Sequence, residues 1–242
     1  MFLVSPNRML KHPKKAVFFD LDHTLWDFDR NARETLEELY FVYRFDEIFG
    51  SSGVDSFIIT YHRNNQRLWG LYNTGQIDKA SLREKRFRDT FTELGADPEA
   101  FPQKFEEDYL SICPRKPHLF PYALETLEYL KTRYSLHLIS NGFREACTVK
   151  IHHSGLISYF DNVVISEIVG VLKPDPAIFA HALGKARVVA AEAVMIGDNL
   201  EADVKGALGA GIEAVYFNPG GKQDLAGGHL DIRCLSDLRK LL

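Results

Sequence analysis

The sequence predicts an α/β protein, with a doubly wound parallel sheet and a helical segment inserted after the first strand. From about residue 115 onwards, short apolar runs alternate with helical patterns, which is typical of parallel strands joined by crossover helices. Between residues 26 and 114, valine and isoleucine become rarer and long helical patterns take over. The length of 242 residues allows one large domain or two smaller ones, and is sufficient for a sizeable core.

The first expected strand, residues 16–19, is the feature around which the chain is organised. It is a continuous apolar run, which favours a strand covered on both faces, and Asp20 and Asp22 follow it directly. Ligands bind at the carboxyl ends of such strands. Two carboxylates that point the same way repel each other unless a cation or a proton separates them. The pair therefore indicates a divalent metal site, proton transfer or both, although Asp is also common in simple turns.

The composition excludes several classes of function. With 45% hydrophobic and 26% charged residues, disorder is not expected, and a net charge of -4 argues against a nucleic-acid polymer as partner. Cys113, Cys147 and Cys234 are far apart, which favours a reducing compartment over a disulfide framework or a zinc site. The apolar run in residues 1–6 is too short for a signal peptide, and no run reaches the roughly 20 residues of a membrane helix. We expect a soluble, cytoplasmic protein without a membrane partner.

The first half of the chain is expected to form a polar, partly disordered arm over residues 1–15, then the first strand, then a small helical bundle. Turn signals at 73–76 and 95–98 separate the helical patterns. The proline-rich segment 113–121 is the expected return linker. Helices are expected at 31–43, 54–72, 78–94 and 100–111.

The second half is expected to alternate between strands and helices. Asp175 is the expected N-cap of a helix whose first turn contains Pro176. A short edge strand near Ile232 and a last helix near Leu238 complete the chain. Strands are expected at 136–139, 162–165, 193–196 and 214–217, helices at 122–132, 144–154, 176–185 and 201–208, and a loop through Lys173.

Polar side chains lie at or near the carboxyl ends of several of these strands. Because parallel strands end at one edge of a sheet, these side chains are expected to meet there. Carboxylate oxygens suit Mg²⁺, whereas a serine hydroxyl, backbone N–H groups and a lysine ammonium bind phosphate oxygens. Each residue alone has an ordinary structural explanation, but the ordered set favours a phosphoryl-transfer site. Its members are Asp20, Asp22, Ser140, Lys173, Asp198 and Asp203.

Four segments of the chain resemble the motifs of the haloacid dehalogenase (HAD) superfamily. These segments are Asp20-Leu21-Asp22-His23-Thr24, Ser140-Asn141-Gly142, Gly170-Val171-Leu172-Lys173-Pro174-Asp175-Pro176 and Gly197-Asp198-Asn199-Leu200-Glu201-Ala202-Asp203. The resemblance spans about residues 16–217, and the helical insertion is similar to the type 1 cap of that superfamily. It implies a Rossmann-like catalytic core over residues 1–25 and 115–242, and a helical cap domain over 26–114 that opens and closes over the site.

The resemblance also implies a role for each motif residue. Asp20 is the implied nucleophile, which forms an aspartyl-phosphate, and Asp22 is the implied acid for the leaving oxygen and base for the attacking water. Ser140 and Asn141 are implied to bind the phosphoryl group, and Lys173 to steady the nucleophile and the anion. Mg²⁺ is the implied cofactor, because attack by a carboxylate on a phosphate requires both charges to be neutralised. Its implied ligands are Asp20, the backbone carbonyl of Asp22 and Asp198, with Asp203 close by or acting through water.

Two details narrow the branch of the superfamily. Members that displace halide usually lack the second aspartate, so Asp22 favours phosphate ester hydrolysis. His23 stands where most phosphatases of the superfamily carry glycine, and it would either contact the leaving group or lie in a solvated loop. Residues 68–77, 82–87 and 22–26 resemble the noncanonical pyrimidine nucleotidases, which implies a nucleoside monophosphate as substrate. The implied leaving-group contacts are Trp69, Tyr72, Arg83 and Arg86, although these residues would equally suit the core and the solvated face of a bundle.

Several alternatives stay open. A sugar phosphatase or a sugar-phosphate mutase would use the same core, and a haloacid dehalogenase is less favoured. A non-enzymatic binding module is disfavoured because no motif residue is missing. Residues 209–214 match GxGxxA but lie between a helix and a strand, the reverse of what a dinucleotide-binding fingerprint requires. We expect a small phosphorylated substrate as partner, and a monomer or homodimer.

Overall fold

The computed structural model describes residues 10–50, 53–221 and 229–242. The chain divides into two compact units, Met1–Asp27 with Pro117–Leu242 and Phe28–Lys116. Residues 1–9 of the expected polar arm lie outside the described residues. The described part of the arm is anchored to the sheet: Lys14 is buried, and its ammonium donates to the Ala191 carbonyl at 2.7 Å and to the Glu213 carboxylate.

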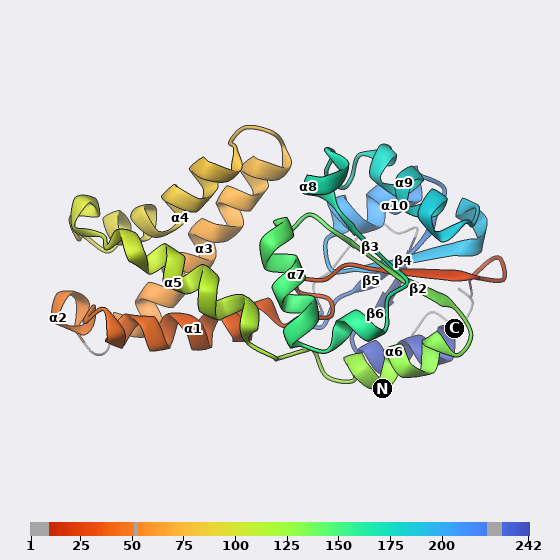
Figure 1. Ribbon diagram of the computed structural model, residues 1–242, viewed down its shortest axis with the longest axis horizontal. Helices are drawn as coiled ribbons and strands as arrows, with labels where there is room; N and C mark the ends of the chain where they lie inside the picture. Colours follow the sequence, from red (N-terminus) through yellow and green to blue (C-terminus); the bar gives the residue numbers. More distant parts are fainter. Residues whose placement is uncertain (1–9, 51–52, 222–228) are drawn as a thin grey trace. The chain divides into compact units, whose positions relative to one another are not determined.

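The first unit is built on a six-stranded sheet in the order β3-β2-β1-β4-β5-β6, and all neighbouring strands are parallel (Figure 1). The chain extends from β1 to β2 and β3 on one side and then returns to β4 on the other side of β1. The carboxyl ends of β1 and β4 therefore form the topological switch point where ligands bind in such sheets. The strands are β1 (Ala16–Phe19), β2 (Ser135–Ser140), β3 (Asn162–Ile165), β4 (Ala193–Gly197), β5 (Glu213–Phe217) and β6 (Leu230–Ile232).

Helices cover both faces of this sheet, which confirms the predicted doubly wound architecture. In Figure 1, α9 and α10 lie on one face of the sheet and α6 on the other. Phe18 of β1 and Phe179 of α9 are fully buried in one hydrophobic cluster, so burial on that face fixes how the strand is oriented. The helices are α6 (Ala123–Lys131), α7 (Arg144–His153), α8 (Ser166–Val169), α9 (Pro176–Ala186), α10 (Gly206–Gly209) and α11 (Leu238–Leu241), with the π-helical segment η5 (Leu200–Lys205) and the 3₁₀ turns η3 (Leu156–Ser158), η4 (Ala190–Glu192) and η6 (Leu235–Asp237).

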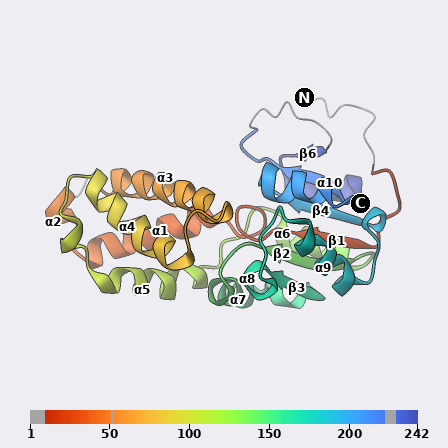
Figure 2. The ribbon, with the colours of Figure 1, turned by 90° about the horizontal axis from the view of Figure 1, so that it is seen from above.

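The second unit is a helical bundle (Figure 2). Aromatic side chains fill its core. Phe45 is buried at its centre, with its ring centroid 4.9 Å from that of Phe91 and 5.2 Å from that of Phe105. Such ring pairs add to the stabilisation that burial alone provides. No helix in the described ranges is both long and apolar enough to cross a membrane. The helices are α1 (Phe28–Val42), α2 (Asp46–Phe49), α3 (Gly53–Asn73), α4 (Lys79–Glu93) and α5 (Gln103–Ile112), with the turns η1 (Pro98–Ala100) and η2 (Cys113–Arg115).

Three local features differ from the sequence-based expectations. The short helix α2 was not predicted, and α8 lies in the segment predicted as a loop through Lys173. The expected helix 201–208 begins as the π-helical segment η5 and continues into α10. Four residues are too few to show a helical period, and a π-helix depends on local contacts that a period does not record.

Candidate active site

The polar side chains gather because three adjacent strands end at the same edge of the sheet. Asp20 follows β1, Ser140 ends β2 and Asp198 follows β4, and β1 pairs in register with both neighbours. The Asp20 N–H donates to the Ile196 carbonyl at 2.9 Å, which ties the end of β1 to β4. Sheet pairing thus fixes the positions of residues that are far apart in the chain.

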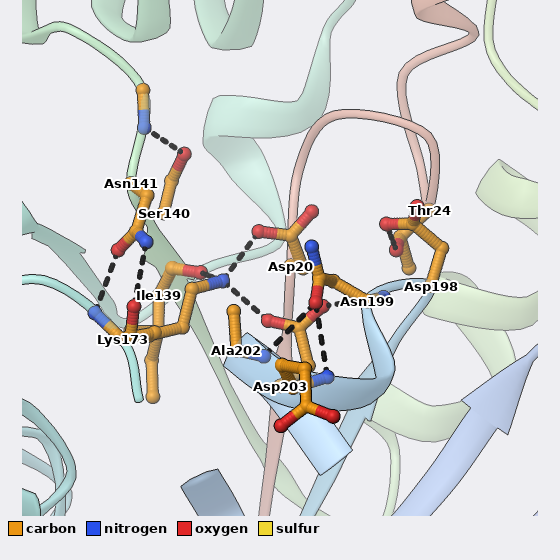
Figure 3. Close-up of polar contacts among 12 residues, drawn as sticks. Asp20, Thr24, Ile139, Ser140, Asn141, Lys173, Asp198, Asn199, Ala202 and Asp203 are labelled. Carbon is orange, nitrogen blue, oxygen red and sulfur yellow. Dashed lines mark hydrogen bonds and ion pairs between the residues drawn. The ribbon is translucent and has the colours of Figure 1, made fainter. Parts of the chain in front are cut away.

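Lys173 is the centre of the site (Figure 3). Its ammonium lies 2.5 Å from Asp20 Oδ1, 2.7 Å from Asp203 Oδ1 and 2.7 Å from the Ile139 carbonyl. Only 2% of the residue is exposed. Three oxygen partners around one buried ammonium satisfy its donors, so the side chain is held in place.

Asp203 reaches the site from the π-helical segment η5. Asn199 caps this segment, since its side chain accepts hydrogen bonds from the N–H groups of Glu201 and Ala202 at 3.0 and 2.9 Å. The Asn199 N–H in turn donates to Asp203 Oδ2 at 3.0 Å. A Cβ on Gly197 would lie 2.3 Å from Asp203 Oδ2, so only glycine allows this close approach.

Asp198 is held by the turn that follows β1. The hydroxyl of Thr24, which is fully buried, donates to Asp198 Oδ1 at 3.2 Å. The first and last motif segments are therefore connected directly, and the orientation of Asp198 depends on both (Figure 3).

The carboxylates in the site are destabilised by burial and by one another. Burial, with the charges of Asp203 and Asp198, raises the pKa of Asp20 well above its ordinary value, although Lys173 opposes the shift. Burial and Asp203 raise the pKa of Asp198 to about 7. Burial alone would lower the pKa of Lys173, but Asp20 and Asp203 outweigh it and the pKa is raised. The ammonium stays charged, and the negative charge around it favours an additional cation or proton.

Asp20, Asp198 and Asp203 fit a hard divalent cation. Each offers a carboxylate oxygen, and these oxygens lie within 4.8 Å of one another. Asp203 Oδ1 is buried and, apart from its ion pair with Lys173, accepts no hydrogen bond from the described part of the chain. All the donors are oxygens, as Mg²⁺ prefers. The Asp22 carboxylate is not part of this cluster, and metal binding by its backbone carbonyl stays a prediction.

Ser140 and Asn141, both predicted to bind the phosphoryl group, have different surroundings. Ser140 is buried, and its Oγ accepts a hydrogen bond from the Gly142 N–H at 3.0 Å. The Asn141 side chain pairs with the backbone of Lys173: its Nδ2 donates to the carbonyl at 2.9 Å, and its Oδ1 accepts from the N–H at 2.8 Å. Asn141 therefore holds the Lys173 segment beside β2, a task that the motif did not indicate. Phosphate binding by both residues stays a prediction.

Asp22 has a partner that sequence reasoning missed. Its Oδ1 lies 2.5 Å from the ammonium of Lys150 in α7, and this ammonium lies 4.2 Å from the ring centroid of Trp26. Lys150 is 6% exposed. The signal in the sequence is its position: Lys150 falls on the apolar side of the helix, between the buried Cys147 and Ile151.

His23 adopts a backbone conformation that favours glycine. Its φ is 62°, and its N–H donates to the Trp26 carbonyl at 3.0 Å, which closes the turn after β1. The left-handed region strains a residue with a Cβ. The geometry of the turn thus gives a physical reason for glycine at this position, and leaving-group contact by His23 stays a prediction.

The candidate substrate contacts in the helical unit differ in burial. Arg86 is 5% exposed; its guanidinium pairs with Glu106 at 3.2 Å and lies 5.2 Å from the ring centroid of Tyr109. These contacts favour the interpretation of Arg86 as part of the bundle core. Trp69 and Arg83 are half-buried. Substrate binding by Trp69, Arg83 and Arg86 stays a prediction.

Comparison with protein families gives one match that covers most of the chain. The family of haloacid dehalogenase-like hydrolases matches residues 14–211. The matched segment begins just before β1 and ends after α10. It therefore contains all the site residues described above.

Characterised relatives cover most of the chain but differ in substrate. The chain is 30% identical to the pyrimidine 5'-nucleotidase YjjG of Escherichia coli over 203 residues. The aligned segment covers 84% of this chain and 85% of YjjG. It is 32% identical over 208 residues to the pyrimidine 5'-nucleotidase PynA of Streptococcus pneumoniae, and the alignment covers 85% of this chain and 84% of PynA. It is 33% identical over 186 residues to a phosphoserine phosphatase of Thermus thermophilus (74% of each).

A solved structure supports the same fold. The HAD-hydrolase YfnB of Bacillus subtilis superimposes with a TM-score of 0.82 at 25% identity, covering 95% of this chain and 99% of YfnB. That YfnB structure is bound to magnesium and reveals interdomain movement.

Proposed function

Because the chain belongs to the family of haloacid dehalogenase-like hydrolases, we propose that it is a magnesium-dependent phosphomonoester hydrolase. The observation that carries the proposal is the buried contact of Asp20 with Lys173 beside two further carboxylates, Asp198 and Asp203. Lys173 binds one oxygen of Asp20, Oδ1, and we assign the attack to the other oxygen, Oδ2. A buried carboxylate among like charges is poised for chemistry with a cation and an anionic substrate.

In the proposed reaction, Asp20 Oδ2 attacks the phosphorus atom and the bond from phosphorus to the ester oxygen breaks. The leaving oxygen takes a proton from Asp22, so that an alcohol departs and an aspartyl-phosphate remains. Asp22, now ionised, accepts a proton from water as that water attacks the phosphorus of the intermediate. Inorganic phosphate leaves, and both aspartates return to their initial states.

Asp20, Asp198 and Asp203 would hold Mg²⁺ together with the backbone carbonyl of Asp22. When bound, Mg²⁺ supplies positive charge that offsets the charges of the nucleophile and the phosphate. Lys173 keeps Asp20 oriented and adds a positive charge of its own beside the nucleophile. Ser140 and the N–H groups after β2 would bind the phosphate oxygens at the end of that strand.

The presence of Asp22 supports phosphate transfer over halide displacement. An alkoxide leaving group needs a proton, whereas halide departs without one. Asp22 lies two residues after the nucleophile, in the turn that the backbone hydrogen bonds of His23 and Trp26 close. This position supports the proposed acid–base role of Asp22.

We propose pyrimidine nucleoside 5'-monophosphates as the substrate class, with leaving-group contacts from Trp69 and Arg83 of the helical unit. Two relatives of about equal coverage are named pyrimidine 5'-nucleotidases, and the resemblance of residues 68–77 and 82–87 supports the same class. A phosphoserine phosphatase at similar identity makes phosphoserine the main competing substrate.

A phosphate-release screen tests both levels of the proposal. The panel contains pyrimidine and purine nucleoside monophosphates, phosphoserine, sugar phosphates and a 2-haloacid, each with Mg²⁺ and with EDTA. Asp20→Asn is the blank, because an amide is a poor nucleophile that leaves the local shape intact. Phosphate release from pyrimidine nucleotides above the other substrates is expected. Preference for phosphoserine would overturn the substrate class, return of phosphate to a sugar would indicate a mutase, and halide release without phosphate release would overturn the reaction.

A further inference from the structure

The buried lysine of α7 forms an interaction with Asp22 that the reaction above does not use. The Lys150 side chain is 7% exposed, and its ammonium meets Asp22 Oδ1 at 2.5 Å. A buried ammonium is costly unless it is paired, and a pair removed from water contributes little net stability. The contact is therefore better explained by a task than by stability alone.

Both ends of this contact are fixed by neighbouring structure. On one side, the Trp26 N–H donates to the Leu21 carbonyl at 2.8 Å, and the His23 N–H donates to the Trp26 carbonyl. This turn presents the Asp22 carboxylate and the Trp26 ring together, and the ammonium lies 4.2 Å from the ring centroid. An aromatic face attracts a cation, so the ring and the carboxylate hold one ammonium jointly.

On the other side, α7 starts directly after the end of β2. Cys147, one turn before Lys150, is buried with its Sγ 3.5 Å from Ser140 Oγ. One continuous, packed segment of the chain therefore contains both the strand end that is expected to bind the phosphoryl group and the lysine that binds Asp22.

The two oxygens of Asp22 have different surroundings. Oδ1 is bound to Lys150, whereas Oδ2 lies 3.5 Å from the position that a Cβ on Gly142 would take. Oδ2 is thus directed at the strand end Ser140–Gly142, beside the predicted phosphate position. One oxygen is anchored, and the other faces the strand end that is expected to bind the phosphoryl group.

We propose that Lys150 is a positioning residue, which anchors one oxygen of Asp22 so that the other exchanges protons with the leaving group and the water. The inference rests on the proposed phosphomonoester hydrolysis. Lys150 itself touches neither the phosphate nor the proton in this account. Removing it would release a partly buried carboxylate to rotate towards solvent, and the acid–base step would lose its geometry.

The test compares two substrates of one enzyme. An alkyl phosphomonoester needs a proton on its leaving oxygen, whereas p-nitrophenyl phosphate releases a stabilised phenolate without one. For Lys150→Met, kcat/KM is expected to fall on the order of 10²-fold for the alkyl ester and by less than about threefold for the aryl ester. The inhibition constant of inorganic phosphate is expected to stay within about threefold of that of the wild type. Lys150→Met added to Asp22→Asn is expected to cause little further loss, because both changes remove one function.

The matched control is Lys14→Met, which removes another buried, ion-paired lysine outside the site. It is expected to leave both kcat/KM values unchanged. If Lys150→Met does not fold, Lys150→Arg and Lys150→Gln serve instead: Arg, which keeps the charge, is expected to retain the alkyl-to-aryl ratio better than Gln.

Three results would overturn the inference. These are equal losses on both substrates, a phosphate inhibition constant weakened in parallel with kcat/KM, which would indicate direct phosphate contact, or additive losses in the double variant. A wild-type enzyme that hydrolyses neither ester would instead overturn the proposed function, so the two failures are distinguishable.

Discussion

Replacing Gly197 by alanine is expected to disrupt the acidic cluster from within. A Cβ at this position would lie 2.3 Å from Oδ2 and 2.4 Å from Cγ of Asp203. Because carbon atoms pack at about 3.5–4.0 Å, Asp203 would have to move by about 1 Å. Its other oxygen forms an ion pair with buried Lys173 at 2.7 Å, which this movement would break. Overpacking costs about 1–3 kcal/mol, and breaking a buried pair costs about 3–5 kcal/mol.

The combined loss in the free energy of unfolding is expected to be roughly 4–8 kcal/mol, which corresponds to a fall in Tm of roughly 8–32 °C for a chain of this size. Thermal unfolding followed by circular dichroism, with and without Mg²⁺, measures it. The matched control is Gly184→Ala in α9, where a Cβ would meet nothing within 4 Å. This control is expected to be neutral or up to about 1 kcal/mol more stable. A Gly197→Ala variant that has the Tm of the wild type, and the same increase in Tm with Mg²⁺, would refute the reasoning.

Three further predictions concern pH, His23 and Asn141. A carboxyl group whose pKa is higher in the folded than in the unfolded protein binds more protons when folded, so the metal-free protein should lose stability as the pH rises from the ordinary aspartate value of 3.8 to the value of about 7 for Asp198, with no further loss from this group above it. Melting curves from about pH 5 to about pH 8 in EDTA should show a Tm that falls with pH and levels off above about pH 7, and excess Mg²⁺ should reduce the fall; a Tm that rises between about pH 5 and about pH 7 in EDTA would contradict it. At φ 62°, His23→Val should lower the free energy of unfolding in urea by about 1–2 kcal/mol, and His23→Gly should change it by less than about 1 kcal/mol. Equal effects of the two changes would show that the backbone of this turn is unstrained. Asn141→Ala removes two hydrogen bonds to the Lys173 backbone, so it should lower the free energy of unfolding by about 1–3 kcal/mol and should also lower kcat. An unchanged kcat would exclude the positioning role of Asn141.

The sequence by itself determined the sheet and the order of the motifs. The run at 16–19 is apolar at every position because β1 is buried on both faces, and such a run indicates a central parallel strand without any knowledge of its neighbours. Once the strands are parallel, their carboxyl ends meet at one edge, so Asp20, Lys173 and Asp198 could be grouped from their places in the chain. N-capping by Asp175 could also be predicted, because it is a local interaction.

Only the tertiary structure decided how the grouped side chains divide their tasks. The pairing of Asn141 with the Lys173 backbone and of Lys150 with Asp22 joins residues 32 and 128 positions apart. Neither contact leaves a period or a turn signal in the sequence, because its geometry arises only when strands and helices pack. Position 197 likewise requires glycine for a tertiary reason. The π-helical segment brings the carboxylate of Asp203 against the end of β4, where it leaves no room for a Cβ.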